Sequence, residues 1–458
     1  MHASKASLFQ LSLEECRTRL TQPSPQLEVD RPCTLGDGIE QWSEDRIDAL
    51  LAHWNAVDDM SCGLWVPASG ASTRMFGFVH TDAESQSQLW NAVDSLAFGA
   101  AWKRAVDRDC GSWQKASAAQ ACDVLWAMME QGDKPKGLVP FHPSADGEGQ
   151  TAFEAHVQHW ADLFPQGAPV WFTVPPTWQQ EIATHLKALC GTHGMALNLP
   201  VQNPATDTPV LTDSGEWMKD ASGAVLKRPG GHGALLPLLE ELSCSIVAIR
   251  NIDNAPSQHV AETRSTWSRA MLSAATLWAA ERTSLQKDLA ERGQVTAPIK
   301  EWLTSAGCEW PEGRMPTADE AADWLQRPMR IVGMVKNEGQ PGGGPFWVRD
   351  EELGGMCRPQ IVEAVEFDAS NQQIQASATH FNPVDMVCIL EPGQSLAPFV
   401  DEERYLKATK RVAGEMAQVL EHPGLWNGGM SGWLTRFVEL PSACFQPVKS
   451  ALDLIDRH

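Results

Sequence analysis

The chain has 458 residues, of which 43% are hydrophobic and 21% charged, a composition typical of a globular protein with one or two hydrophobic cores. Its formal net charge of -22 argues against nucleic acid or an anionic membrane surface as a partner. The 11 cysteines include no CxxC pair, the N-terminus lacks a signal-peptide layout and no apolar run is long enough to span a membrane, so we expect a cytoplasmic protein with reduced thiols and no membrane partner.

The first part of the chain predicts helices around one strand. Residues 1–60 predict a helical N-terminal extension, because apolar residues recur at helical spacing after residue 43. Leu64 to Ala68 is the first apolar run that predicts a buried strand. Residues 83–131 then predict a helical insertion, since their apolar residues again lie three or four positions apart.

Three further apolar runs predict strands at 170–174, 196–199 and 245–249. Strands that alternate with helices indicate an α/β fold with mostly parallel strands, here over residues 61–260. In such a sheet the ligand lies beyond the carboxyl ends of the strands. Residues 261–328 predict a second helical insertion, and 329–458 predict strands with glycine-rich turns that complete the same catalytic domain.

A loop of small residues follows the first predicted strand and ends in an arginine. Small side chains let backbone N–H groups approach an anion, and a helix that starts here adds the positive end of its dipole. The guanidinium adds a fork of donors for phosphate oxygens. The alternative is a turn that serves packing alone. The loop residues are Ala68, Ser69, Gly70, Ala71, Ser72, Thr73 and Arg74.

Asp253 follows the apolar run 245–249, at the end of a predicted strand. A carboxylate at this position can hold Mg²⁺, which bridges nucleotide phosphates; the alternative is an Asp that caps a turn. Lys136 and Lys449 are further cations for phosphate, or else solvated surface lysines. A second glycine-rich turn surrounds His232, which otherwise serves as a structural hydrogen-bonding group.

Four segments of the chain, in this order, resemble those of the UDP-sugar pyrophosphorylases, which are sugar-phosphate nucleotidyltransferases. They are Val66 to Met75, Pro229 to Gly233, Asn251 to Asn254, and Phe445 to Lys449. The family usually has glycine where this chain has Ser72. The chain also resembles an uncharacterised bacterial branch of that superfamily, through Pro135 to Leu138, Thr379 to Asp385 and Leu425 to Gly428.

The resemblance implies a glycosyltransferase-A-like fold, with a mixed and mostly parallel sheet flanked by helices. It also implies an enzyme that joins UTP to a sugar 1-phosphate, possibly of hexosamine type, with Mg²⁺ as cofactor, to give a UDP-sugar and pyrophosphate. The oxygen of the sugar phosphate attacks the α-phosphorus of UTP in line. Catalysis of such a reaction rests on positioning and on charge stabilisation.

The resemblance further implies a role for each matched residue. The loop 68–73 and Arg74 hold the triphosphate, while Lys136 and Lys449 offset charge at the reacting phosphates. Asp253 holds the metal, with Asp385 or Asn382 as a second ligand. The residues near the nucleotide base, the ribose and the sugar are, in chain order, Gln202, Gly231, His232, Gly233 and Glu363.

Two other functions stay open. A glycosyltransferase of the same fold consumes a nucleotide sugar, but such enzymes usually carry Asp-X-Asp, whereas Asp253 is followed by Asn254. A sensor of nucleotides or sugar phosphates is the second alternative, although it would not require every charge-offsetting group. A Rossmann dehydrogenase is disfavoured, because no complete GxGxxG follows the first predicted strand.

Overall fold

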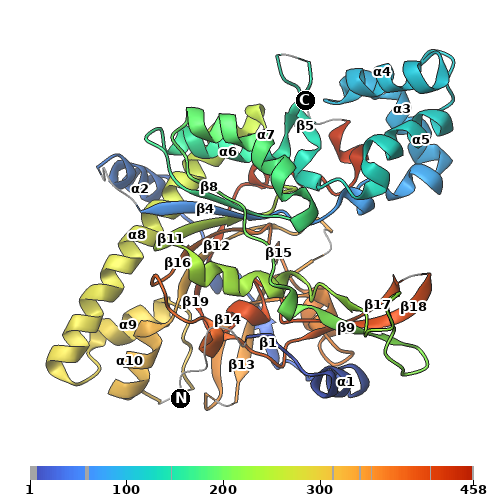
Figure 1. Cartoon of the computed structure of the whole chain (residues 1–458). Coiled ribbons are helices and arrows are strands. Elements are labelled where there is room, and N and C mark those ends of the chain that lie inside the picture. The colour runs from blue at the N-terminus through green and yellow to red at the C-terminus, as the bar shows by residue number, and fades with distance from the viewer. Residues whose placement is uncertain are drawn as a thin grey trace. The chain divides into compact units, whose positions relative to one another are not determined.

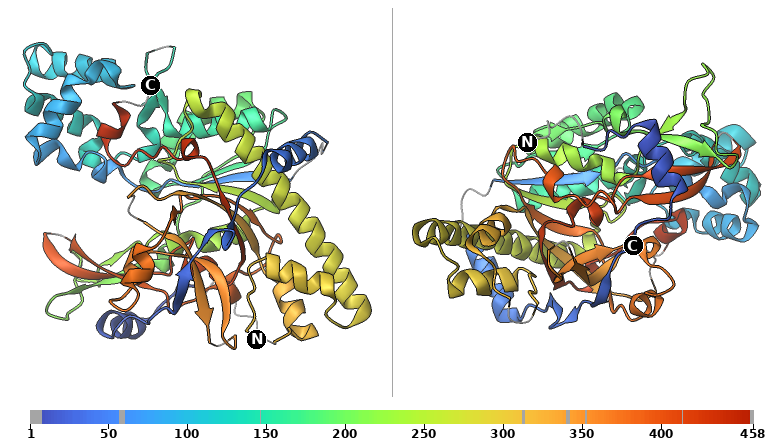
Figure 2. Two further views of the ribbon diagram at one scale, coloured as in Figure 1. Left: turned by 180° about the vertical axis from the view of Figure 1, so that it is seen from behind. Right: turned by 90° about the horizontal axis from the view of Figure 1, so that it is seen from below.

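The computed structural model describes residues 8–56, 61–145, 147–311, 314–339, 342–351, 353–412 and 414–455 (Figure 1). Contacts between residues group the chain into two units. Unit 1 comprises Met1–Ser61, Gln202–Ala248 and Ala270–Leu440, and unit 2 comprises Cys62–Val201, Ile249–Arg269 and Pro441–His458. Strand β11 (Ile246–Arg250) and the 32-residue helix α8 (Ala261–Arg292, Figure 2) contribute residues to both units. The predicted division into sequence ranges stays a prediction.

Unit 2 contains the parallel strands β4 (Cys62–Pro67), β7 (Val170–Thr173) and β8 (Leu197–Asn198). Leu64 pairs with Val170, which pairs in turn with Leu197. Nearly all residues of β4 and β7 are buried, as is usual for parallel strands covered on both faces. The other elements of unit 2 are α3 (Ala83–Asn91), α4 (Gly99–Cys110), α5 (Ala118–Met128), β5 (Pro140–His142), β6 (Gln150–Thr151), α6 (Ala152–Leu163) and α7 (Gln179–Thr192).

The main sheet of unit 1 has the strand order β2 (Thr34–Leu35), β3 (Gly38–Glu40), β19 (Leu434–Glu439), β12 (Met329–Lys336) and β16 (Asp385–Ile389). The first four strands are parallel, and β16 is antiparallel to β12. The short β15 (His380–Phe381) pairs with the end of β12. The α/β fold with a mostly parallel sheet and flanking helices, expected from the sequence, is therefore confirmed.

Unit 1 also contains two antiparallel sheets. One has the order β1 (Val29–Pro32), β13 (Gly344–Asp350) and β14 (Met356–Val362), and the other has β10 (Lys227–Arg228), β9 (Thr208–Thr212), β18 (Glu415–Glu421) and β17 (Leu406–Val412). Its helices are α1 (Leu13–Thr21), α2 (Glu44–Ala56), α9 (Ala297–Ser305), α10 (Ala318–Gln326) and α11 (Gln372–Ala376).

The first sixty residues differ from the helical extension that the sequence predicts. Helices α1 and α2 are present, but β1, β2 and β3 lie between them. Val29 of β1 pairs with Val348 of β13, and Ile39 of β3 pairs with Phe437 of β19. Pairing with strands more than three hundred residues away decides the structure of this segment, and local helical periodicity cannot report it.

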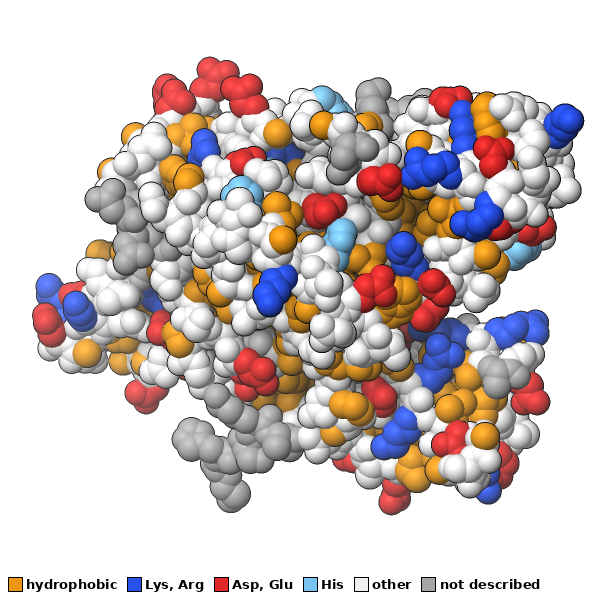
Figure 3. Space-filling model, turned by 45° about the horizontal axis from the view of Figure 1, so that its top comes forward, with side chains coloured by type: hydrophobic (Ala, Val, Ile, Leu, Met, Phe, Trp, Pro, Cys, Tyr) orange, Lys and Arg blue, Asp and Glu red, His pale blue; other side chains and the backbone are white. Residues whose placement is uncertain are grey.

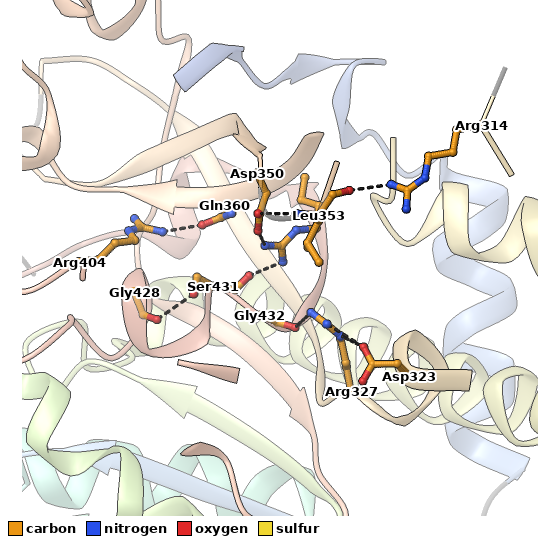
Figure 4. A network of polar contacts seen from close by, with 11 residues as sticks. Arg314, Asp323, Arg327, Asp350, Leu353, Gln360, Arg404, Gly428, Ser431 and Gly432 are labelled. Atoms are coloured by element: carbon orange, nitrogen blue, oxygen red, sulfur yellow. Dashed lines mark hydrogen bonds and ion pairs between the residues drawn. The ribbon is translucent and has the colours of Figure 1, made fainter. Parts of the chain in front are cut away.

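Buried arginines tie the strands of unit 1 to its loops (Figure 4). Arg358 donates to the backbone oxygen of Ser431 at 2.7 Å and to Asp350 at 3.0 Å. Arg404 donates to Gln360 at 2.5 Å and forms an ion pair with Glu366 at 2.7 Å. Each guanidinium thus satisfies the polar groups of several segments at once, which suits its planar fork of donors. Among the helices of the described ranges, none combines the length and apolar character needed to cross a membrane.

Candidate active site

Four segments of unit 2, distant in sequence, meet beyond the end of β4. The loop 68–74 pairs with the segment 134–136, because Ser72 N–H donates to Lys134 O at 3.0 Å and Lys136 N–H to Gly70 O at 3.2 Å. The C-terminal segment joins them through Val448 N–H, which donates to the backbone oxygen of Asp253 at 2.9 Å. These backbone contacts place Arg74, Lys136, Asp253 and Lys449 in one neighbourhood.

Asp253 lies at the centre of this neighbourhood. Its Oδ2 is 2.8 Å from Lys449 Nζ and 3.5 Å from Lys136 Nζ. The other carboxylate oxygen, Oδ1, is buried and has no hydrogen-bond partner among the described residues. Since buried polar atoms are normally paired, Oδ1 is the candidate acceptor for a ligand at this site.

The two lysines have different surroundings. The side chain of Lys136 is 14% exposed and donates to Val448 O at 3.1 Å, whereas that of Lys449 is 60% exposed. Burial lowers the pKa of Lys136, and the positive charges of Lys449 and Arg74 lower it further, against the opposing effect of Asp253. Lys136 is therefore a buried cation close to two other positive charges, while Lys449 contacts Asp253 from the protein surface.

The loop 68–74 offers an accessible backbone. Ser69, Gly70 and Ala71 are exposed, their N–H groups have no hydrogen-bond partner among the described residues, and a Cβ at Gly70 would meet nothing within 4 Å. Ser72, in contrast, is fully buried, so its side chain does not crowd the exposed face of the loop. The exposed backbone of the loop thus leaves room for a ligand, and its role in binding an anion stays a prediction.

The helix expected directly after this loop is absent. After the loop the chain forms two short 3₁₀ turns, Ser72–Arg74 and Gly77–His80, and the next α-helix, α3, starts only at Ala83. Pairing with 134–136 keeps the backbone extended as far as Ala71, which has φ -72° and ψ 159°. A dipole from a long helix therefore adds nothing here, and the charge of the site comes from side chains.

A divalent cation fits this site as a ligand shared with substrate. No group of three or more His, Cys, Asp or Glu side chains suited to a metal occurs in the described part of the chain. The carboxamide of Asn254 is engaged with backbone groups of residues 444 and 446. Asp253 Oδ1 could therefore serve as a ligand of Mg²⁺, which is commonly held by one or two carboxylates, water and substrate phosphates.

The second glycine-rich turn belongs to unit 1. His232 Nδ1 accepts from Leu425 N–H at 2.9 Å, and its ring stacks on Trp426 with 5.1 Å between centroids. A Cβ on Gly231, which has φ 81°, would meet the Glu421 side chain at 2.9 Å, and one on Gly233 would meet the backbone at residue 423. The close approach that these glycines permit is to the chain's own segment 421–425. The backbone donor fixes the neutral tautomer of His232 with its proton on Nε2.

Four more predicted residues also belong to unit 1. Gln202 donates to Thr206 at 3.2 Å and to Asp207 at 3.1 Å, so its amide is engaged within its own loop. Burial and the charge of Glu366 raise the pKa of Glu363 to about 7. The buried Asn382 accepts from Val384 N–H, and the buried Asp385 begins β16.

A family model described as "Domain of unknown function (DUF4301)" matches residues 4–458. The chain belongs to this family. No curated protein matches it. Among solved structures it is similar to a mutant UDP-glucose pyrophosphorylase from Leishmania major in complex with UDP-glucose, at 12% identity and a TM-score of 0.45, over 94% of this chain and 69% of that one. It is also similar to UDP-glucose phosphorylase from Trypanosoma brucei, at 13% identity and a TM-score of 0.46, over the same shares.

Two polar residues of the site received no role from the sequence motifs. Asn254 bridges two backbone groups of the C-terminal segment, and Asp453 Oδ2 accepts from the N–H groups of Lys449 and Ser450 at 2.7 Å each. Asn254 follows Asp253 directly in a matched motif, which is the one signal that could have singled it out. Asp453 follows the matched C-terminal segment and stands three positions after Ser450, at the capping-box spacing of the last turn.

Proposed function

We propose that this protein is a nucleotidyltransferase that joins UTP to a sugar 1-phosphate and releases pyrophosphate. The observation that carries the proposal is the convergence of Lys136 and Lys449 on Asp253, beside the exposed backbone of the loop 68–74. The choice of UTP and of a sugar 1-phosphate rests on the resemblance of the motifs to UDP-sugar pyrophosphorylases.

The charges of this neighbourhood favour a polyanion. The positive charges of Arg74 and Lys449 act on Lys136, which lies beside the carboxylate of Asp253. Asp453 lies nearby, but it caps backbone N–H groups. The chain as a whole has a formal charge of -22, and Figure 3 shows acidic and basic side chains interspersed on the face displayed. A local excess of positive charge in such a chain is well suited to phosphates.

The proposed reaction needs no acid or base from the protein. An oxygen of the sugar 1-phosphate forms a bond to the α-phosphorus of UTP, while the bond to the bridging oxygen breaks and pyrophosphate leaves with the electron pair. Lys136 stabilises charge at the α-phosphate from a fixed position, and Lys449 draws the attacking phosphate toward it. Arg74 and the N–H groups of residues 69–71 bind the remaining phosphates. Mg²⁺, when bound at Asp253, would neutralise charge on the phosphates.

The roles proposed for residues of unit 1 rest on the resemblance of their motifs alone. The resemblance implies that Gln202 reads the uracil edge; because its amide nitrogen donates to Thr206 and Asp207, the amide oxygen is the group proposed to contact the base. The resemblance implies that Gly231, His232 and Gly233 lie near the base and ribose, where the Nε2–H of His232 would be the donor, although the two glycines pack here on the segment 421–425. Glu363 binds sugar hydroxyls, and Asn382 contacts the substrate. The role of Asp385 as a metal ligand stays a prediction from the resemblance.

The test is a transfer assay with purified protein, Mg²⁺, each of the four common nucleoside triphosphates and a panel of sugar 1-phosphates. We expect pyrophosphate and a sugar nucleotide in equal amounts, with UTP preferred. Release of nucleoside diphosphate from added nucleotide sugars would favour the glycosyltransferase alternative. Triphosphate binding without any product would favour a sensor. Absence of both binding and turnover would contradict the proposal.

A further inference from the structure

The C-terminal segment that carries Lys449 is held by the side chain of Asn254. Asn254 Nδ2 donates to Cys444 O at 3.1 Å, and Asn254 Oδ1 accepts from Gln446 N–H at 2.9 Å. The side chain is 1% exposed, so both bonds are shielded from water. Its carboxamide therefore bonds to the segment as a backbone peptide group of a neighbouring strand would.

These bonds set the register of the segment. Two residues after Gln446, Val448 N–H donates to the backbone oxygen of Asp253. The N–H groups of residues 446 and 448 thus both donate to residues 253 and 254, one to a side chain and one to the backbone. Lys449 follows at once, with its ammonium 2.8 Å from Asp253 Oδ2. A shift of the segment by one residue would remove that ammonium from the carboxylate.

We infer that Asn254 is a positioning residue, which fixes the C-terminal segment so that Lys449 reaches the reacting phosphates. The inference deepens the proposed function and rests on it for the role of Lys449. We call the two hydrogen bonds of Asn254 to the C-terminal segment the clamp. The clamp does not depend on the proposed function, because these bonds and the ion pair of Lys449 are properties of the free protein.

The chemistry of the clamp requires an amide at residue 254. Cys444 O accepts from Asn254 Nδ2 and also from Arg264 Nη1 at 2.5 Å, so the carbonyl is fixed in place. Asp at position 254 has the same shape but would bring a negative oxygen against that carbonyl and lose the donor. Asn254→Asp is therefore a nearly isosteric change that breaks the clamp selectively.

The experiment compares the wild type with Asn254→Asp in the full chain by three measurements. Amide hydrogen exchange follows the N–H groups of residues 446 and 448, a lysine-acylating reagent reports the accessibility of Lys449, and calorimetry gives the affinity for UTP with Mg²⁺. Asn198→Asp is the matched control, because Asn198 Nδ2 donates to two backbone carbonyls of the same unit, Val170 O and Ala196 O. Asn254→Ser serves in its place if Asn254→Asp does not fold.

We expect Asn254→Asp to raise exchange at residues 446 and 448 by at least tenfold, to raise the acylation rate of Lys449, and to weaken UTP binding as much as Lys449→Met does. Combining the two substitutions should weaken binding no further, and Asn198→Asp should leave all three readouts unchanged. Unchanged exchange and acylation would overturn the inference, as would losses of affinity that multiply in the double variant. If the wild type binds no triphosphate, the proposed function fails, while exchange and acylation still decide whether Asn254 positions Lys449.

Discussion

The two carboxylate oxygens of Asp253 have different environments. Oδ2 faces Lys136 and Lys449, and Oδ1 is buried without a partner in the described part of the chain. This asymmetry allows one oxygen to hold the lysines in place while the other accepts a ligand. A residue that served only to cap a turn would have both oxygens on backbone N–H groups or in water.

Asp253→Asn tests this asymmetry, because it keeps the shape of the side chain and removes its charge. We expect transfer activity to fall by roughly 100-fold or more, the size of loss typical when one charge-stabilising group is removed. The measurement is the rate of pyrophosphate release, together with the midpoint of thermal unfolding. Asp162→Asn, at an exposed position of α6, is the control. Activity of Asp253→Asn close to that of the wild type would remove Asp253 from the site.

The lowered pKa of Lys136 predicts how activity depends on pH. Because burial and the charges of Lys449 and Arg74 disfavour its ammonium, Lys136 loses its proton at a lower pH than an ordinary lysine. We expect kcat/KM to fall on the alkaline side below the usual range of lysine titration. In Lys449→Met one repelling charge is gone, so the alkaline limb of the remaining activity should move to higher pH. A limb at the same pH in both proteins would contradict this assignment.

The lowered pKa of Lys136 also predicts how the free energy of unfolding depends on pH. Between the lowered pKa of Lys136 and its usual value of 10.5, the unfolded chain binds more protons than the folded one. Lys136 therefore makes the folded state more stable as pH rises through that window, and less stable below it. Activity and this contribution to stability thus change in opposite directions with pH, so alkaline inactivation by Lys136 is distinct from unfolding.

The turn before Lys136 contains three consecutive residues with positive φ. Glu130, Gln131 and Gly132 have φ of 52°, 53° and 85° in succession. Thr73 Oγ1 donates to Gly132 O at 2.9 Å, so this turn supports the loop that carries Arg74. Consecutive left-handed residues cost conformational energy and persist where surrounding contacts hold them. The turn therefore couples the position of Lys136 to that of the loop 68–74.

Gly132→Ala separates backbone strain from packing at this turn. A Cβ at Gly132 would meet Trp126 at 2.6 Å and the Cα of Thr73 at 3.1 Å. We expect a loss of about 2–4 kcal/mol in the free energy of unfolding, which combines left-handed strain with overpacking. Gly111→Ala is the control, because Gly111 has φ 82° but nothing within 4 Å of a Cβ, and it should cost only about 1–2 kcal/mol. Equal losses in denaturant unfolding would contradict the packing argument.

The local sequence pattern predicted strands correctly where that pattern and the tertiary structure agree. The apolar runs at 64–68, 170–174, 196–199 and 245–249 coincide with β4, β7, β8 and β11 to within two residues at each end. Local pattern did not predict β1 and β3, whose partners β13 and β19 lie far away in sequence, or β2, which pairs with β3. The 3₁₀ turns after the loop 68–74 depend on pairing with 134–136, which no local signal reports.

Across the whole chain, the motifs predicted which residues lie near one another, but they did not predict the individual contacts that each residue makes. Arg74, Lys136, Asp253 and Lys449 come together in unit 2, although Arg74 and Lys449 are 375 positions apart in the sequence. The engagement of Gln202 with Thr206 and Asp207, and the packing of Gly231 and Gly233 on 421–425, could not be foreseen from composition or spacing. Such contacts depend on side-chain partners that only the folded chain defines.

The proposed function requires that Lys136 and Lys449 bind a triphosphate. Calorimetric titration of UTP with Mg²⁺ tests this binding most directly. We compare the wild type, Lys136→Met, Lys449→Met, the double variant, and Lys115→Met as a control at an exposed lysine of the same unit. The prediction is micromolar binding by the wild type and the control, and a loss of roughly tenfold or more for each site lysine, as expected for a charged hydrogen bond to phosphate. Equal affinity in all five proteins, or no binding by the wild type, would contradict the account.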